Sequence, residues 1–337
     1  MDKITYTELE AMLMNPDTPD EDIAPYLTVD GEGSSAFDPR VVPDQDKVEL
    51  GPEGEFRTEN AMRWANDIAR WRRAKRFERR RPGSDLPVLV SEGDSWFQFP
   101  FLVKDTVDQL GEDHLIWSLD AAGDTAENMV NRRPEYLAGL RAQKANGVAA
   151  FLFSAAGNDV IGEDAFGEPV LLSLLKPHDP ERDAAWHIDQ AALARVLTFL
   201  ETAYQRVVAT VRADDDLART PILVHAYDYA LPGGHPGDPR HPRWAAQDKW
   251  LGRALVRRDI TDQQLQRDVV RILIDATYDM LERVCGDSSR TGVHLVDVRG
   301  TLPEVTDWVD EIHATDDGFR RVADRFRATL REVGVGG

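Results

Sequence analysis

From residue 85 onwards, short apolar runs alternate with longer amphipathic segments, and this alternation constrains the fold more than any other feature. The apolar runs lie at residues 86–90, 115–119, 148–153, 222–224 and 293–298. Two of the intervening segments, 188–207 and 265–280, carry apolar residues at helical spacing. Short strands that alternate with long helices predict a parallel sheet with both faces covered. We therefore expect an α/β fold.

The first 60 residues form a distinct acidic zone, with 16 acidic and 4 basic side chains. Residues 7–10 (Thr-Glu-Leu-Glu) predict a capping box at the start of a helix that ends at Asn15-Pro16. Residues 18–21 (Thr-Pro-Asp-Glu) predict the start of a second helix, with Pro19 in the first helical position. Residues 30–59 are rich in Gly, Pro, Asp and Glu, which is typical of a linker. This extension is either a docking module for a partner protein or an arm packed on the body.

Residues 61–84 reverse the charge, with a net of +7. A basic amphipathic helix is expected over 60–81, with an apolar stripe made by Trp64, Ile68, Trp71 and Phe77. Basic residues interleaved with tryptophan suggest RNA or a membrane surface. We favour a helix whose stripe packs on the body and whose arginines pair with acidic groups, because the rest of the chain is strongly acidic.

Composition excludes several classes of protein. A net charge of −20 argues against general binding to nucleic acid or anionic membranes, since the average field repels phosphates. We expect no transmembrane segment and no secretory signal, and hence a soluble cytoplasmic protein. Cys285 is the single cysteine, which excludes an internal disulfide and a cysteine-based zinc cluster. Four histidines in long connections lack the spacing of metal ligands, so no metal is assigned to His178, His187, His235 and His241.

Polar or glycine-bearing sequences follow each of the five apolar runs, at the sheet edge where open α/β folds place their sites. They are residues 92–96 (EGDSW), 120–124 (DAAGD), 154–159 (SAAGND), 225–229 (HAYDY) and 308–313 (WVDEIH). Together they supply a serine, glycines with exposed backbone, an asparagine and an Asp/His pair.

These groups suit acyl transfer. Ser95 needs a base to become a nucleophile; His313 is the natural base, and Asp310, three residues earlier, can orient the imidazole. A tetrahedral intermediate also needs hydrogen-bond donors for its oxyanion. The backbone amides of Ser95 and Gly123 and the side-chain amide of Asn158 are the candidate donors.

The motifs GDSW at 93–96, Gly123, GND at 157–159 and DEIH at 310–313 resemble the four blocks of the SGNH, or GDSL-like, hydrolase family, in the family's order and over about residues 85–335. The resemblance implies a three-layer α/β/α sandwich on a five-stranded parallel sheet, similar to flavodoxin. It implies hydrolysis of carboxylic esters or thioesters without metal or organic cofactor, with the triad and oxyanion donors named above. It also implies that Ser95 lies on the turn into the first helix of the domain. Thr315 and Gly318 match the family's C-terminal block.

The chain departs from the family at Trp96, where leucine is usual, and residues 1–84 have no counterpart in the family pattern. We expect Asp94, Trp96, His225 and Tyr227 to line a pocket; ordinary packing at a strand end is the other interpretation of His225 and Tyr227. The Gly/Pro-rich stretch 231–259 is either a lid or a surface loop capped by a short helix.

Two hypotheses follow. The first is a serine esterase that acts on a small ester: an acyl sugar, a lysophospholipid, an acyl thioester or an aryl ester. The second is a non-catalytic recognition or scaffold protein with the same fold, docked to a partner through residues 1–84. The two combine if the N-terminal extension delivers an esterase to its substrate.

Overall fold

The computed structural model describes residues 3–29, 41–50, 61–162, 168–241, 245 and 250–336, with side chains from residue 65 in the third range. A five-stranded parallel sheet forms its centre, in the order β6-β5-β7-β8-β9. The strands are β5 (Val88–Gly93), β6 (Leu115–Ser118), β7 (Val148–Ser154), β8 (Ile222–His225) and β9 (Val293–Leu295). Each strand overlaps one of the five apolar runs. The strand order is that of flavodoxin-like sheets, so the predicted fold class is confirmed.

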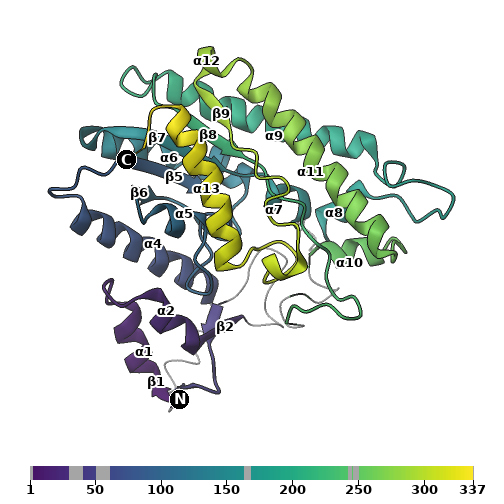
Figure 1. Ribbon diagram of the computed structural model, residues 1–337, viewed down its shortest axis with the longest axis horizontal. Coiled ribbons are helices and arrows are strands. Elements are labelled where there is room, and N and C mark those ends of the chain that lie inside the picture. Colours follow the sequence, from purple (N-terminus) through teal and green to yellow (C-terminus); the bar gives the residue numbers. More distant parts are fainter. Residues whose placement is uncertain are drawn as a thin grey trace.

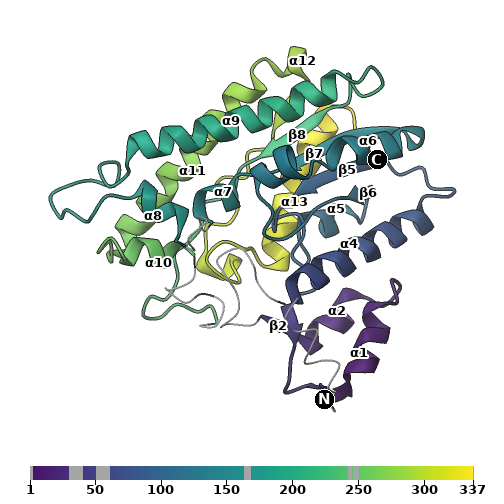
Figure 2. The same cartoon turned by 180° about the vertical axis from the view of Figure 1, so that it is seen from behind.

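Helices cover both faces of this sheet, as the continuous burial of its strands requires. Figure 2 shows α6 (Tyr136–Gln143) and α9 (Gln190–Arg212) in front of the sheet and α13 (Asp316–Glu332) behind it. The short α5 (Thr106–Leu110) packs against α13, and α11 (Gln263–Cys285) packs against α9 and strand β9. The predicted helices over 188–207 and 265–280 correspond to α9 and α11.

The remaining helices of the described residues lie in connections. They are α7 (Gly157–Ile161), α8 (Val170–Leu174), α10 (Leu251–Val256) and α12 (Ser288–Thr291), with a π-helical turn η2 (Asn128–Arg132) and the 3-10 turns η1 (Ala24–Tyr26), η3 (Lys144–Asn146) and η4 (Val305–Asp307). Within the described residues, no helix is long and apolar enough to cross a membrane.

The N-terminal extension forms a small unit below helix α4 (Ala61–Arg80) in Figure 1. It contains β1 (Ile4–Thr5), α1 (Tyr6–Leu13), α2 (Asp20–Ile23), β2 (Leu27–Val29), β3 (Val41–Pro43) and β4 (Val48–Glu49). Strand β1 pairs with β4, and β2 with β3. Leu9, Leu13, Ile23 and Val41 form a separate apolar cluster with Ile68 of α4.

Three local expectations for the extension were wrong. The capping box begins at Thr5, whose hydroxyl accepts the Glu8 amide at 3.2 Å while the Glu8 carboxylate accepts the Thr5 amide at 2.7 Å; Thr7 lies inside the helix. Pro19 is the N-cap of α2 and not its first helical residue. The expected linker contains strands β3 and β4, and its residues 30–40 and 51–59 lie outside the described part of the chain.

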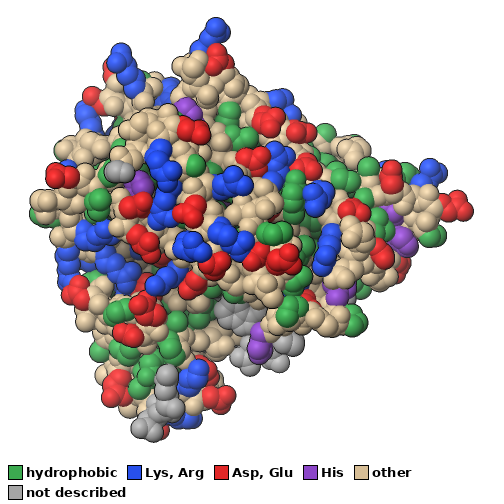
Figure 3. Space-filling model, in the orientation of Figure 1, with side chains coloured by type: hydrophobic (Ala, Val, Ile, Leu, Met, Phe, Trp, Pro, Cys, Tyr) green, Lys and Arg blue, Asp and Glu red, His purple; other side chains and the backbone are tan. Residues whose placement is uncertain are grey.

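The expected basic helix is α4 (Ala61–Arg80), which lies along the edge strand β6. Its arginines pair within the chain. Arg72, 1% exposed, donates to the carbonyl of Leu13 at 2.7 Å and to Asp20 at 2.9 Å. Arg73 binds Asp105 at 2.6 Å. On the face shown in Figure 3, acidic and basic side chains lie interspersed.

The aromatic stripe of α4 contacts the body through Phe77, whose ring meets Trp117 edge-on at 5.4 Å. The side chain of Trp64 lies outside the described part of the chain.

Candidate active site

The sheet register brings three strand ends together. Gly93 of β5 pairs with Ser154 of β7, and Ser154 pairs with His225 of β8. The chain segments that follow these three residues therefore begin next to one another at the same edge of the sheet. Ser95 lies two residues beyond the end of β5, and Asn158 lies four residues beyond the end of β7.

Ser95, His313 and Asp310 form a continuous hydrogen-bonded chain. His313 Nε2 lies 2.8 Å from Ser95 Oγ, and His313 Nδ1 lies 2.7 Å from Asp310 Oδ2. All three side chains are buried, with Ser95 the most exposed at 6%. When Nδ1–H donates to Asp310, Nε2 is free to accept the Ser95 hydroxyl proton.

The loop before α13 fixes the imidazole. Asp310 Oδ1 accepts the backbone amides of Ile312 at 2.8 Å and His313 at 2.7 Å, so the carboxylate is oriented by its own loop. The Phe99 ring meets the His313 ring edge-on at 4.5 Å. Thr315 then caps α13 by accepting the Gly318 amide at 3.1 Å. The histidine is thus held immediately before a rigid helix.

Ser95 stands on a single helical turn and not at the start of a helix, which corrects the expectation from the resemblance. The Asp94 carbonyl accepts the amides of Phe97 at 3.0 Å and Gln98 at 2.9 Å, but α5 begins only at Thr106. Gly93 permits this sharp exit from β5, because a Cβ there would lie 2.6 Å from the Phe97 ring.

A buried network connects the turn of Ser95 with the turn of Asn158. The Tyr227 hydroxyl donates to Asp94 Oδ2 and accepts the Gly157 amide at 2.8 Å. Asp94 also accepts the Trp96 amide at 3.1 Å. Burial raises the pKa of Asp94 to about 7, against the opposing effects of these hydrogen bonds and of His313.

The three candidate oxyanion donors lie at neighbouring strand ends. Gly123 adopts φ +82° in a turn closed by the Asp124 amide and the Ala121 carbonyl at 3.1 Å, a conformation that favours glycine. The Asn158 side-chain amide donates to the Asp124 carbonyl, which brings the second and third strand ends into contact. Neither the Ser95 amide nor the Gly123 amide donates to any described residue, so both remain available to a substrate oxygen.

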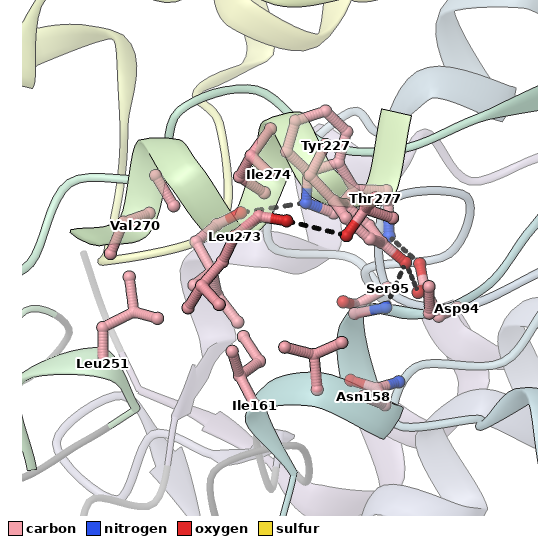
Figure 4. A pocket seen from close by; sticks show the side chains of 16 residues that line it. Asp94, Ser95, Asn158, Ile161, Tyr227, Leu251, Val270, Leu273, Ile274 and Thr277 are labelled. Atoms are coloured by element: carbon pink, nitrogen blue, oxygen red, sulfur yellow. Dashed lines mark hydrogen bonds between the residues drawn. The ribbon is translucent and has the colours of Figure 1, made fainter. Parts of the chain in front are cut away.

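Of the expected pocket residues, Asp94, Trp96 and Tyr227 line a cavity beside Ser95 and Asn158 (Figure 4). Trp96 also donates from Nε1 to the Ile312 carbonyl at 2.9 Å, and so joins the Ser95 turn to the His313 loop. For His225, the structure fits the other interpretation, ordinary packing at a strand end. Its fully buried ring lies outside the cavity lining, stacks on Phe97 at 5.4 Å and bonds to Ser154 Oγ at 2.8 Å. Burial lowers the pKa of His225 to about 4.

Sequence reasoning missed Glu311, which attaches the stretch 231–259 to the His313 loop. Its buried carboxylate accepts the backbone amides of Gly233 and Trp250 at 2.8 Å and of Leu251 and Gly252 at 3.0 Å. A glutamate inside a candidate catalytic motif gave no separate signal.

Arg240 provides a second attachment of the same stretch. It donates to the carbonyls of Asp310 and Leu231, both at 2.8 Å. A short helix, α10, ends the stretch, as one of the two interpretations expected. Trp244 lies outside the described residues.

Among the described residues, no group of three or more His, Cys, Asp and Glu side chains is arranged to hold a metal ion.

The comparisons with known proteins find similarity in structure but not in sequence. No family model matches the chain, and no curated protein matches its sequence. Among solved structures, the chain is similar to a protein from Bacteroides ovatus described as a "putative GDSL-like lipase", with 13% identity and a TM-score of 0.41 over 74% of this chain and 54% of that one. The chain thus spans about half the length of that protein.

A second similar structure is described as a "putative platelet activating factor" from Streptococcus pneumonia, with 11% identity and a TM-score of 0.44 over 83% of this chain and 100% of that one. At these identities and TM-scores, neither likeness transfers an activity to this chain.

Proposed function

We propose that the protein is a serine hydrolase of the SGNH type, which cleaves carboxylic esters or thioesters through an acyl-enzyme on Ser95. One observation carries the proposal: a nucleophile, a base and an orienting carboxylate are joined by hydrogen bonds of 2.8 and 2.7 Å. Ser95 and His313 are 218 residues apart in the chain.

The reaction uses the groups in turn. Ser95 Oγ attacks the carbonyl carbon while its proton passes to His313 Nε2, and Asp310 stabilises the imidazolium. The amides of Ser95 and Gly123 and the side chain of Asn158 receive the oxyanion. His313 then gives its proton to the leaving alkoxide or thiolate as the C–O or C–S bond breaks. Water, deprotonated by His313, attacks the acyl-enzyme and releases the acid and the Ser95 hydroxyl.

Replacement of the nucleophile tests the proposal directly. Ser95→Ala is expected to lower kcat for a short aryl ester by about four or more orders of magnitude, and to abolish labelling by a fluorophosphonate. Ser289→Ala removes an exposed hydroxyl on α12 and serves as the matched control. Equal hydrolysis by wild type and Ser95→Ala, together with no labelling of Ser95, would contradict the proposal and favour a non-catalytic recognition protein.

A further inference from the structure

A cavity of about 60 Å³ opens directly beside Ser95 and Asn158. Figure 4 shows Ile161 of α7, Leu251 of α10 and several residues of α11 around it. Apart from the residues of the site itself, its wall is made of aliphatic side chains: Val160, Ile161, Leu251, Val270, Leu273 and Ile274.

The described part of the wall offers no positive charge to a negatively charged substrate group. No lysine or arginine occurs among the described lining residues. The hydroxyl of Thr277 is already bonded to the Leu273 carbonyl at 2.9 Å, within helix α11. The Tyr227 hydroxyl is bonded to Asp94. An ionised substrate group would lose its hydration here without compensation, so the cavity favours an uncharged apolar group.

The position of the base decides which half of an ester enters the cavity. The described lining includes Ser95 and Asn158 but not His313. His313 must reach the leaving oxygen to protonate it, so the alcohol departs on the histidine side of Ser95. The acyl chain, which stays on Ser95 after the alcohol leaves, is the half that points into the cavity.

The volume limits the length of that chain. Since one water-sized group needs about 10–15 Å³ of such space, the cavity holds about four groups of that size. Resting on the function proposed above, we propose that the substrates are esters or thioesters of short, uncharged acyl groups, of about four to six carbons, with the chain in this cavity and the alcohol or thiol outside it.

A series of p-nitrophenyl esters from acetate to dodecanoate tests the acyl length. Each buried methylene is expected to raise kcat/KM about fourfold, so butyrate should exceed acetate by about tenfold or more, with a decline beyond hexanoate. The mono-p-nitrophenyl ester of succinate, similar in length to the butyrate ester but negatively charged, should be hydrolysed at least about tenfold more slowly. A flat profile, a maximum at acetate or dodecanoate, or equal rates for succinate and butyrate would overturn the proposal.

Leu273→Phe tests the cavity itself, with Ile272→Phe as the matched control on the same helix but outside the lining. Leu273→Phe should lower hexanoate hydrolysis by at least about tenfold while acetate hydrolysis stays within about twofold, which also shows that the variant folds. Ile272→Phe should preserve the wild-type ratio of hexanoate to acetate. An unchanged ratio in Leu273→Phe would contradict the proposal.

Two isomeric esters separate the halves of the substrate. Leu273→Phe should impair methyl hexanoate and spare hexyl acetate; the opposite result would place the alcohol in the cavity and overturn the proposal. If Ser95-dependent hydrolysis occurs without any of these preferences, only this inference fails. If no ester is hydrolysed in a Ser95-dependent way, the proposed function itself fails.

Discussion

The role proposed for Asn158 at the reacting oxygen can be tested on its own. One of its amide hydrogens binds the Asp124 carbonyl, which fixes the side chain while it borders the cavity beside Ser95. A fixed donor that faces the oxyanion should act mainly in the transition state. We therefore expect Asn158→Ala to lower kcat by about 10²–10³-fold, with KM changed much less.

Steady-state kinetics with a short-chain aryl ester would check this expectation. Asn128→Ala is the matched control, because Asn128 also binds Asp124, through the carboxylate at 2.7 Å, but does not line the cavity. A rise in KM at constant kcat would show that Asn158 only helps to bind the substrate.

Single residues differ in how well the sequence predicts their place. The apolar runs placed Ser95 and Asn158 beyond the ends of β5 and β7, and these strands are neighbours in the sheet, whereas His313 lies in the loop before α13. His225 ends a strand too, yet its ring points into the core beneath the site and bonds to Ser154. The position of a residue along the chain predicts that it lies at this edge of the sheet. The direction of the His225 side chain depends instead on its packing against Phe97 and Phe326.

At the scale of elements, long periodic segments were predictable and short ones were not. Helices α9 and α11 each span 23 residues with one buried stripe, so their periodicity is clear. Strands β1 and β4 have two residues each and exist only because they pair across 44 positions. Helix α5 starts late because Asp105 accepts the amides of Val107 and Asp108. That cap was overlooked because the family pattern suggested a helix directly after Ser95.

Glu311 links the stretch 231–259 to the His313 loop through hydrogen bonds. Burial raises the pKa of Glu311 to about 7, so at pH 8 the carboxylate is ionised and accepts four backbone amides. In Glu311→Gln, the side-chain NH₂ would face two of these amides, donor against donor. We expect a loss of about 1–3 kcal/mol in the free energy of unfolding and faster hydrogen exchange at Trp250, Leu251 and Gly252.

Hydrogen exchange followed by mass spectrometry at pH 8 would measure this effect. Glu332→Gln, at an exposed position near the end of α13, should leave both quantities unchanged. Unaltered exchange in Glu311→Gln would show that α10 is held by its apolar contacts instead.

For the molecule as a whole, part of the uneven charge of the sequence is paired within the fold. Residues 1–60 carry a net charge of −12 and residues 61–84 carry +7. The structure sets these two zones against each other: Asp20 binds both Arg72 and Arg76, and Asp17 binds Arg79. The basic helix that suggested a polyanion partner thus uses several of its arginines to hold the N-terminal extension. This pairing could not be derived from periodicity, because it depends on which face of α4 meets α1 and α2.

Buried carboxyls give the whole molecule an unusual dependence of stability on pH. Burial raises the pKa of both Asp94 and Glu311 to about 7, above the usual values near 4. Between pH 6.5 and 8 the folded protein therefore holds protons that the unfolded chain has lost, and stability falls as pH rises through 7. The slope for each such group is at most about 1.4 kcal/mol per pH unit.

Other buried carboxyls add to the same decline, because burial raises the pKa of Asp159 to about 6 and raises the pKa of Glu92 well above its usual range. His225, whose pKa is lowered to about 4, acts in the opposite direction, but only below the ordinary histidine pKa near 6.5. Acids whose pKa is lowered by ion pairs, such as Asp20, titrate below pH 4. Urea unfolding at pH 6.5, 7, 7.5 and 8 should show a declining free energy of unfolding, with a flatter decline in Asp94→Asn and the wild-type slope in the exposed control Asp215→Asn. A free energy of unfolding that does not fall over this range, with the same slope in wild type and Asp94→Asn, would mean that both carboxyls are ionised in the folded protein, and that their backbone and tyrosine donors outweigh the cost of burial.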